Sequence, residues 1–352
     1  MYYAQNSQIS FREISIRPAL RMLVWTLPLW ISLFVLFPRF NGSLWSFKSQ
    51  KSGQGSFSGS IDPSTADEVS LSDQVQFNLR FLGTTPSVNE LYFRAGVLGE
   101  TRGLQWTEGI LPKETMLGAS TKPTIEYEII LEPSHDRWLF PIDFPIAVHA
   151  SDQFWEKQIQ SPLLGTFKMS QAVHKAIFLK ASSGESPKIS WSEELSEIYT
   201  KIPSPTLRIE KLLQKLAQKK NSDAEKVTSL LDFFAGGDFH YSQKPGLMKS
   251  PSIDEFIFKH RIGFCEHFAA SFAYLLRAMQ IPARVVIGYQ GGQPNSITHT
   301  IAVREKDAHA WTEYFDRSES RWIRVDPTQV VAPLRLQLGG DWIGHAVSSQ
   351  RS

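Results

Sequence analysis

One apolar helix followed by several strand-like segments constrains the fold of this chain most. In the stretch RIGFCEHFAASFAYLL, residues 261–276, and just beyond it, apolar side chains recur at helical spacing, and Pro282 ends the pattern. The strand-like segments that follow are RVVIGY (284–289), HTIAV (299–303), DAHAWTEYF (307–315) and RWIRVDPT (321–328). A helix followed by a largely antiparallel sheet predicts an α+β fold.

The region before this helix shows a different periodicity. In QVQFNLRF (74–81) and TIEYEIIL (124–131), apolar and polar residues alternate, as is typical of half-buried strands. The chain of 352 residues, 42% of them hydrophobic, is long enough for two domains. The expected borders are a β-rich, antiparallel domain at 67–181, a linker at 182–200, a second domain at 201–338 and a tail at 339–352.

A charge-free apolar run stands near the start of the chain. MLVWTLPLWISLFVLFP, residues 22–38, is close to the lower limit of about 17 residues for a spanning helix. We expect a transmembrane helix there, after an N-terminal segment at 1–21; a cleaved signal peptide and a buried core helix are the alternatives. Basic residues flank both ends, so the positive-inside rule does not decide its orientation. The Ser- and Gly-rich residues 39–66 predict a flexible linker.

The charge and cysteine content narrow the class of function. With 37 basic and 35 acidic residues, the formal net charge is +2, and no basic stripe is interleaved with aromatic side chains. Nucleic-acid binding is therefore not expected. A single cysteine, Cys265, excludes an intramolecular disulfide and leaves the redox compartment open.

Cys265 stands at or just before the first turn of the apolar helix. The unsatisfied amides of a helix N-terminus favour a thiolate, and they can also receive a developing oxyanion. A nucleophile in this place would still need a base and a group that orients the base. The alternatives are a structural thiol and a zinc site with His267 and His260 or His299, although the paired spacing of known zinc ligands is missing.

The last two strands contain a candidate base and its orienting group. If residues 316–319, DRSE, form a four-residue loop, Phe315 pairs with Ser320 and His309 lies opposite Asp326. Directly opposed side chains lie about 4.5 to 5.5 Å apart at Cβ, which allows an imidazole to donate to a carboxylate. A slip of one residue would turn one of the two side chains to the other face. An ordinary strand histidine and an Asp-Pro turn are the alternatives.

These blocks, in this order, resemble the transglutaminase-like superfamily. The resemblance rests on GFCEHFAASFAYLLRAMQIPARVVIGYQGG, DAHAWTEYF and WIRVDPT, and covers roughly residues 201–336. It implies a papain-like core with a Cys, His, Asp triad. Position by position, Cys265 is similar to the nucleophile, His309 to the general base and acid, and Asp326 to the residue that holds the imidazole.

The upstream sequence resembles bacterial membrane-anchored transglutaminase-like proteins, through VSLSDQVQFNLRF and LYFRAGVLGETRGLQW. That resemblance implies anchoring in the cytoplasmic membrane of a bacterial cell envelope, with an extracytoplasmic catalytic domain. Such proteins usually carry several spans before this helix and one after the catalytic domain. The single expected span here therefore predicts a truncated or minimal form.

The reaction expected from these residues is acyl transfer through a thioester on the cysteine, from a glutamine carboxamide of a protein or peptide to an amine or to water. The Cys265 amide would receive the oxyanion, with Tyr241 as a candidate second donor and Trp311 as a wall of the cleft. No metal or cofactor is required. A cysteine peptidase or amidase on the same triad, and a catalytically silent papain-like module that binds or scaffolds envelope components, are the alternatives.

Overall fold

The computed structural model describes residues 21, 25–28, 59–65, 72–117, 122–134, 136–163 and 165–334. Most of the expected membrane helix, residues 22–38, lies outside these ranges, as do residues 1–20 and the tail at 339–352. Among the described residues, no helix is both long and apolar enough to cross a bilayer. The spanning helix therefore stays a prediction.

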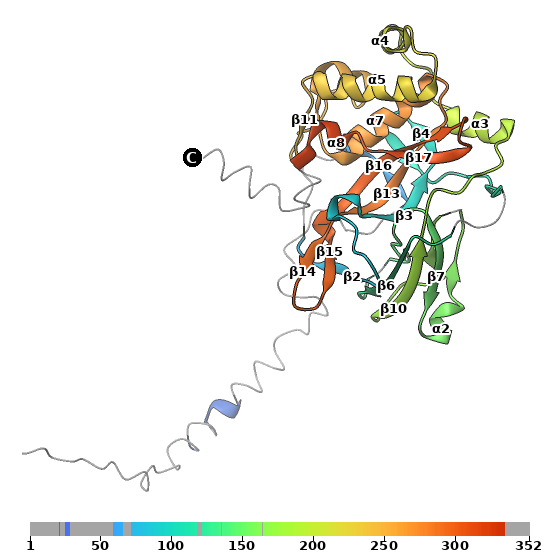
Figure 1. The fold of residues 1–352 in the computed structure, drawn as a ribbon. Helices are drawn as coiled ribbons and strands as arrows, with labels where there is room; N and C mark the ends of the chain where they lie inside the picture. Colours follow the sequence, from blue (N-terminus) through green and yellow to red (C-terminus); the bar gives the residue numbers. More distant parts are fainter. Residues whose placement is uncertain are drawn as a thin grey trace, which may run out of the picture. The chain divides into compact units, whose positions relative to one another are not determined.

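The strand segments with alternating apolar and polar residues belong to a six-stranded antiparallel sheet (Figure 1). Phe77, Leu79, Tyr127 and Ile129 point into its core and are fully buried, which confirms the alternation expected for the first two strand segments. The order of the strands is β14 (Gln293–Asn295), β15 (Thr300–Arg304), β2 (Val75–Phe81), β6 (Ile125–Leu131), β10 (Ile177–Ser183) and β7 (Pro145–Ala150).

A four-stranded antiparallel sheet supports the apolar helix α7 (Cys265–Ala278). Its order is β17 (Arg321–Val325), β16 (Ala308–Asp316), β13 (Ala283–Gln290) and β3 (Tyr92–Leu98). The helix packs on β16 and β13, and Thr312 Oγ1 donates to the Ala269 carbonyl at 3.0 Å. The predicted α+β fold is confirmed.

The two regions expected as separate domains exchange strands. β3 comes from the N-terminal region and pairs with β13, whereas the β14–β15 hairpin comes from the C-terminal region and pairs with β2. Both sheets therefore contain strands from both regions, and residues from either region can reach the same site.

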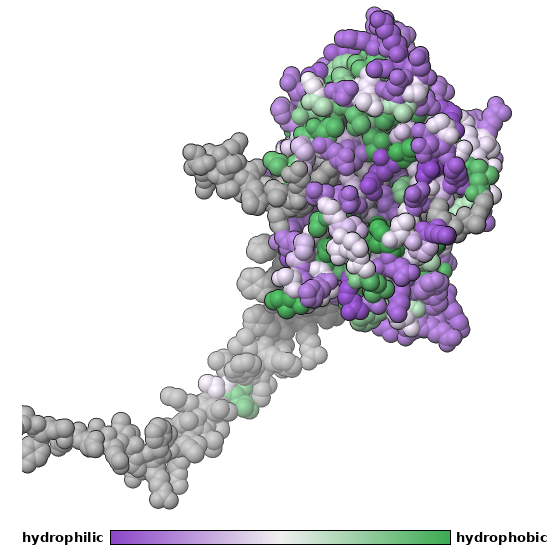
Figure 2. All heavy atoms as spheres, in the orientation of Figure 1, coloured by the Kyte–Doolittle hydropathy of each residue, from purple (hydrophilic) through white to green (hydrophobic). Residues whose placement is uncertain are grey.

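Further helices cover the outer side of α7 (Figure 1). Residues 222–225 form a capping box, because Ser222 accepts from the Glu225 amide while Glu225 accepts from the Ser222 amide. Figure 2 shows a largely hydrophilic outer surface with smaller hydrophobic areas. These helices are α4 (Leu207–Ala217), α5 (Asp223–Gly236), α6 (Ile253–Glu255), the π turn η4 (Phe256–His260) and α8 (Thr328–Val331). A further helix, α3 (Glu193–Thr200), packs against Phe315 and Trp322.

Short elements complete the described chain. They are β1 (Ser60–Ile61), η2 (Pro63–Thr65), η3 (Val88–Glu90), β4 (Glu100–Arg102), β5 (Gln105–Thr107), α2 (Gln153–Glu156), β8 (Ile159–Gln160), β9 (Lys168–Met169), β11 (His240–Tyr241), β12 (Ile262–Gly263) and η5 (Glu305–Asp307). β1 and η2 fall inside the expected linker at 39–66, and α3 falls inside the one at 182–200. They are ordered because Ile61 and Pro63 are buried near α7, while Leu195 and Tyr199 are buried against Phe315 and Trp322.

The expected register of the β16–β17 hairpin is wrong by two residues. Phe315 pairs with Trp322, not with Ser320, and Asp316 pairs with Arg321. Asp316 is thus the last paired residue of β16 and not the first residue of the loop. Its carboxylate accepts from the loop amides of Ser318 and Glu319, at 2.8 and 3.1 Å. A two-residue shift leaves every side chain on its expected face, and His309 and Asp326 stay neighbours.

Candidate active site

Cys265 is the first residue of α7, which confirms its expected place at the helix start. The short strand β12 pairs in parallel with β11 and leads the chain into the helix through Gly263. A Cβ on Gly263 would lie 2.7 Å from the Cβ of His267, so only glycine fits this turn. Cys265 has a free thiol and is 7% exposed as a residue, and the helix N-terminus places backbone amides beside it.

His309 and Asp326 form a buried ion pair. His309 Nε2 lies 2.7 Å from Asp326 Oδ2, and each residue is 3% exposed. Because an ionised carboxylate only accepts hydrogen bonds, Nε2 carries the proton that is shared with Asp326. Asp326 Oδ1 accepts from the Thr328 amide at 2.9 Å, which fixes the second oxygen.

The other ring nitrogen of His309, Nδ1, is also buried. Nδ1 has no hydrogen-bond partner among the residues that the structure describes. Burial by itself lowers the pKa of His309, but the charge and hydrogen bond of Asp326, together with Cys265, raise this pKa to about 9. Burial likewise opposes ionisation of Asp326, yet His309, Tyr92 and the Thr328 amide hold its pKa below the ordinary value. The structure thus brings Cys265, His309 and Asp326 together.

The two remaining candidates, Tyr241 and Trp311, pack against α7 and against His309. Tyr241, on β11, is half-buried, and its ring stacks on Phe268 of α7 with the centroids 6.3 Å apart. Trp311 is fully buried and stacks against His309 at 6.4 Å, so it packs beneath the imidazole and does not form an exposed wall of a cleft.

His267, one of the histidines of the zinc alternative, contacts the backbone of its own helix start. His267 Nδ1 accepts from the Phe264 amide at 3.4 Å, and burial lowers the pKa of His267 to about 3. Within the described ranges, no group of three His, Cys, Asp or Glu side chains is arranged to hold a metal ion.

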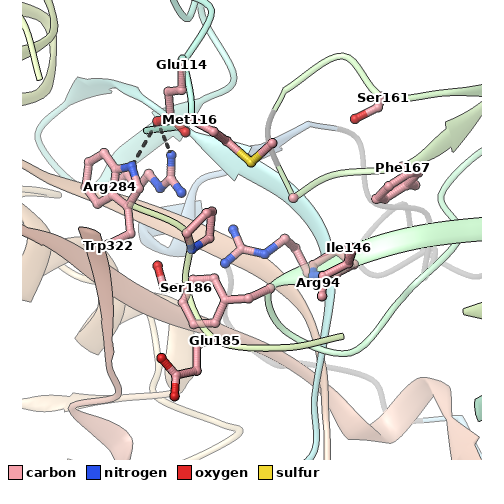
Figure 3. A pocket seen from close by; sticks show the side chains of 14 residues that line it. Arg94, Glu114, Met116, Ile146, Ser161, Phe167, Glu185, Ser186, Arg284 and Trp322 are labelled. Carbon is pink, nitrogen blue, oxygen red and sulfur yellow. Dashed lines mark hydrogen bonds and ion pairs between the residues drawn. The ribbon is translucent and has the colours of Figure 1, made fainter. Parts of the chain in front are cut away.

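A buried ion network behind His309 was not expected from the sequence. Glu313, on the same face of β16 as His309, pairs with Arg94 and with Arg284, the latter at 2.8 Å. Arg284 also pairs with Glu114 at 2.7 Å, and Arg94 pairs with Asp143 at 2.9 Å. A cavity of about 120 Å³ lies against this network, lined by Arg94, Glu114 and Arg284 among others (Figure 3). The network ties β3 to the strand that carries His309.

We expect Glu313→Gln to destabilise the fold by about 3 to 5 kcal/mol, because it leaves two buried guanidinium groups without their shared carboxylate. Glu128→Gln on β6 is the matched control, since its partner Arg80 is 57% exposed and such pairs contribute about 1 kcal/mol or less. Urea unfolding of the two variants measures the difference. Equal losses would show that the buried network adds nothing to stability.

Tyr92 is a further residue of the site that sequence reasoning missed. It lies on β3, 234 residues before Asp326 in the chain, and its hydroxyl donates to Asp326 Oδ2 at 2.9 Å. The stretch that contains it, LYFRAGVLGETRGLQW, resembles the bacterial relatives, but nothing in its pattern shows that β3 joins the sheet of β16.

Comparison with known proteins gives a consistent assignment. Residues 3–175 match the TgpA N-terminal domain, and residues 210–327 match the transglutaminase-like superfamily. A protein-glutamine gamma-glutamyltransferase of Pseudomonas aeruginosa is 33% identical over 340 residues, which cover 92% of this chain and 48% of that protein. The uncharacterised protein YebA of Bacillus subtilis is 32% identical over 149 residues, 39% of this chain and 20% of YebA. The chain therefore spans about half or less of these relatives.

Two solved structures resemble the fold over most of its length. The periplasmic domain of TgpA from Pseudomonas aeruginosa is 30% identical, with a TM-score of 0.71 over 81% of this chain and 98% of that domain. The same domain bound to ethylmercury is 31% identical, with a TM-score of 0.70 over 80% of this chain and 99% of that one. On the strength of both the sequence matches and the shared fold, the chain belongs to the transglutaminase-like superfamily.

Proposed function

We propose that this protein catalyses acyl transfer from the carboxamide of a peptide-bound glutamine to a primary amine, through a thioester on Cys265. The observation that carries the proposal is the arrangement of His309. Its Nε2 is held by Asp326, while its Nδ1 has no other partner in the described part of the chain and Cys265 adds to its raised pKa. A base oriented in this way beside a thiol at a helix start suits a cysteine acyltransferase.

The proposed reaction has two halves. The Cys265 thiolate attacks the carboxamide carbon, the carbonyl oxygen gains charge beside the amides of the α7 N-terminus, and the imidazolium of His309 gives its proton to the departing ammonia. An incoming amine then attacks the thioester, His309 takes a proton from that amine, and Cys265 leaves as the thiolate. The products are an isopeptide bond and ammonia. Tyr241 is the proposed second donor to the oxyanion.

Water in place of the amine would give glutamate, so an amidase or peptidase differs from a transferase only in the acceptor. The name of the Pseudomonas aeruginosa relative, a protein-glutamine gamma-glutamyltransferase, favours transfer to an amine. The solved relative is a periplasmic domain, which supports an extracytoplasmic location for residues 67–338, with residues 22–38 as the proposed anchor.

The test is to incubate the purified protein with a glutamine peptide and a labelled primary amine. Label incorporation with ammonia release supports transfer. Ammonia release without label, or a cut peptide, points to a hydrolase on the same residues. If the protein yields neither product, the activity is absent and the chain is better explained as a binding module of the envelope.

A further inference from the structure

Asp326 is held by more than the histidine it orients. Its Oδ2 accepts from His309 Nε2 at 2.7 Å and from the Tyr92 hydroxyl at 2.9 Å. Two donors therefore share one carboxylate oxygen, and both donating residues are almost completely buried. The tyrosine therefore holds the same carboxylate oxygen that accepts from His309.

Three further contacts hold the Tyr92 side chain in place. Gln329 Nε2 donates to this hydroxyl at 3.2 Å, which leaves the phenolic proton for Asp326. The Arg324 guanidinium lies 4.0 Å from the ring centroid on one side, and Trp311 meets the ring edge-to-face at 5.2 Å. The position of the phenol is thus determined by packing, and its hydrogen bond to Asp326 is preformed.

Arg324 is in turn held by the buried ion network that contains Arg94. It pairs with Asp143 at 2.6 Å, and Asp143 pairs with Arg94 on β3 at 2.9 Å.

Tyr92 remains a hydrogen-bond donor because it keeps its proton. Burial, and then the charge of Asp326, raise the pKa of Tyr92 far above its ordinary value.

We propose that Tyr92 is a positioning residue for the acyl-transfer reaction, acting through Asp326 on the orientation and charge of His309. The inference rests on the proposed function and extends it, because it gives the N-terminal region a part in the chemistry. The Tyr92 hydroxyl comes from β3, outside residues 201–338. It reaches Asp326 because β3 pairs with β13 in the four-stranded sheet.

The test compares Tyr92→Phe with Tyr274→Phe in the purified protein. Tyr274 is the matched control, because its hydroxyl donates to the Pro203 carbonyl at 2.9 Å, away from the triad. For Tyr92→Phe we expect kcat to fall roughly 10- to 100-fold with KM within about twofold, since the lost bond is to a charged group and not to substrate. Tyr274→Phe should keep both constants.

A second readout is the titration of the His309 ring followed by NMR, which needs no turnover. Without the phenol donor, the Asp326 carboxylate interacts more strongly with the imidazolium of His309. The pKa of His309 should therefore rise above about 9 in Tyr92→Phe and remain at about 9 in Tyr274→Phe. General loosening of the site would lower this pKa instead. An unchanged or lowered pKa overturns the inference. If the unsubstituted protein transfers no acyl group, the proposed function fails, yet the titration still decides the role of Tyr92.

Discussion

Replacing Cys265 with alanine is expected to lower the rate of labelled-amine incorporation by roughly 10⁴-fold or more, since removal of a triad nucleophile has effects of this order. The chain contains one cysteine, so no second thiol can form the thioester. His309 and the helix amides would remain, but neither can form the thioester. The measurement is the initial rate of incorporation at saturating amine.

The alanine variant should stay folded, which separates chemistry from stability. Only the sulfur is removed from a side chain at the edge of the core, and this costs about 1 kcal/mol. Thermal unfolding checks this point. A folded Cys265→Ala protein that still incorporates the amine at a tenth of the original rate would contradict a thioester at this residue.

Asp326→Asn is expected to lower kcat by roughly 10³- to 10⁴-fold, the loss seen when an acid that orients a triad histidine becomes an amide. The carboxylate accepts from His309, Tyr92 and the Thr328 amide, and an amide nitrogen in its place would face one of these donors. The asparagine would then turn or leave a donor unpaired, and the imidazole would lose its fixed direction.

The same change should shift the pH dependence in a defined direction. Burial lowers the pKa of His309, whereas Asp326, together with Cys265, raises it to about 9, so loss of the Asp326 charge lowers this pKa. The imidazolium that protonates the leaving group would then lose its proton at lower pH. The basic limb of the pH–rate profile should therefore shift to lower pH. Asp73→Asn, which alters a carboxylate with 77% of its side chain exposed, is the control and should leave rate and profile unchanged. A basic limb that stays in place in Asp326→Asn would mean that Asp326 does not set the charge of His309.

The sequence was sufficient to predict the parts of the site that depend on local pattern. The helical spacing of apolar residues places Cys265 at a helix start, and the strand-like segments 307–315 and 321–328 place His309 on a strand next to the one that leads to Asp326. The pairing was predicted two residues out because an aspartate can be either the first residue of a loop or the last paired residue before it. In the structure Asp316 is the last paired residue, and its carboxylate accepts from two loop amides.

Contacts between distant parts of the chain could not be predicted in this way. Tyr92 meets Asp326 and Arg94 meets Glu313 only because β3 pairs with β13 and places both residues in the sheet of β16. No periodicity in a single sequence states which strands from two regions become neighbours. Buried arginine and glutamate residues are also indistinguishable from surface residues by pattern alone, until their partners are known.

The most direct test of a thioester on Cys265 is mass spectrometry of the protein after reaction with a glutamine acyl-donor probe in the absence of amine. We expect one acyl adduct, on the proteolytic fragment that contains Cys265, which disappears when amine is added and does not form in Cys265→Ala. An adduct on any other residue, or transfer of the acyl group without an adduct on Cys265, would contradict the thioester.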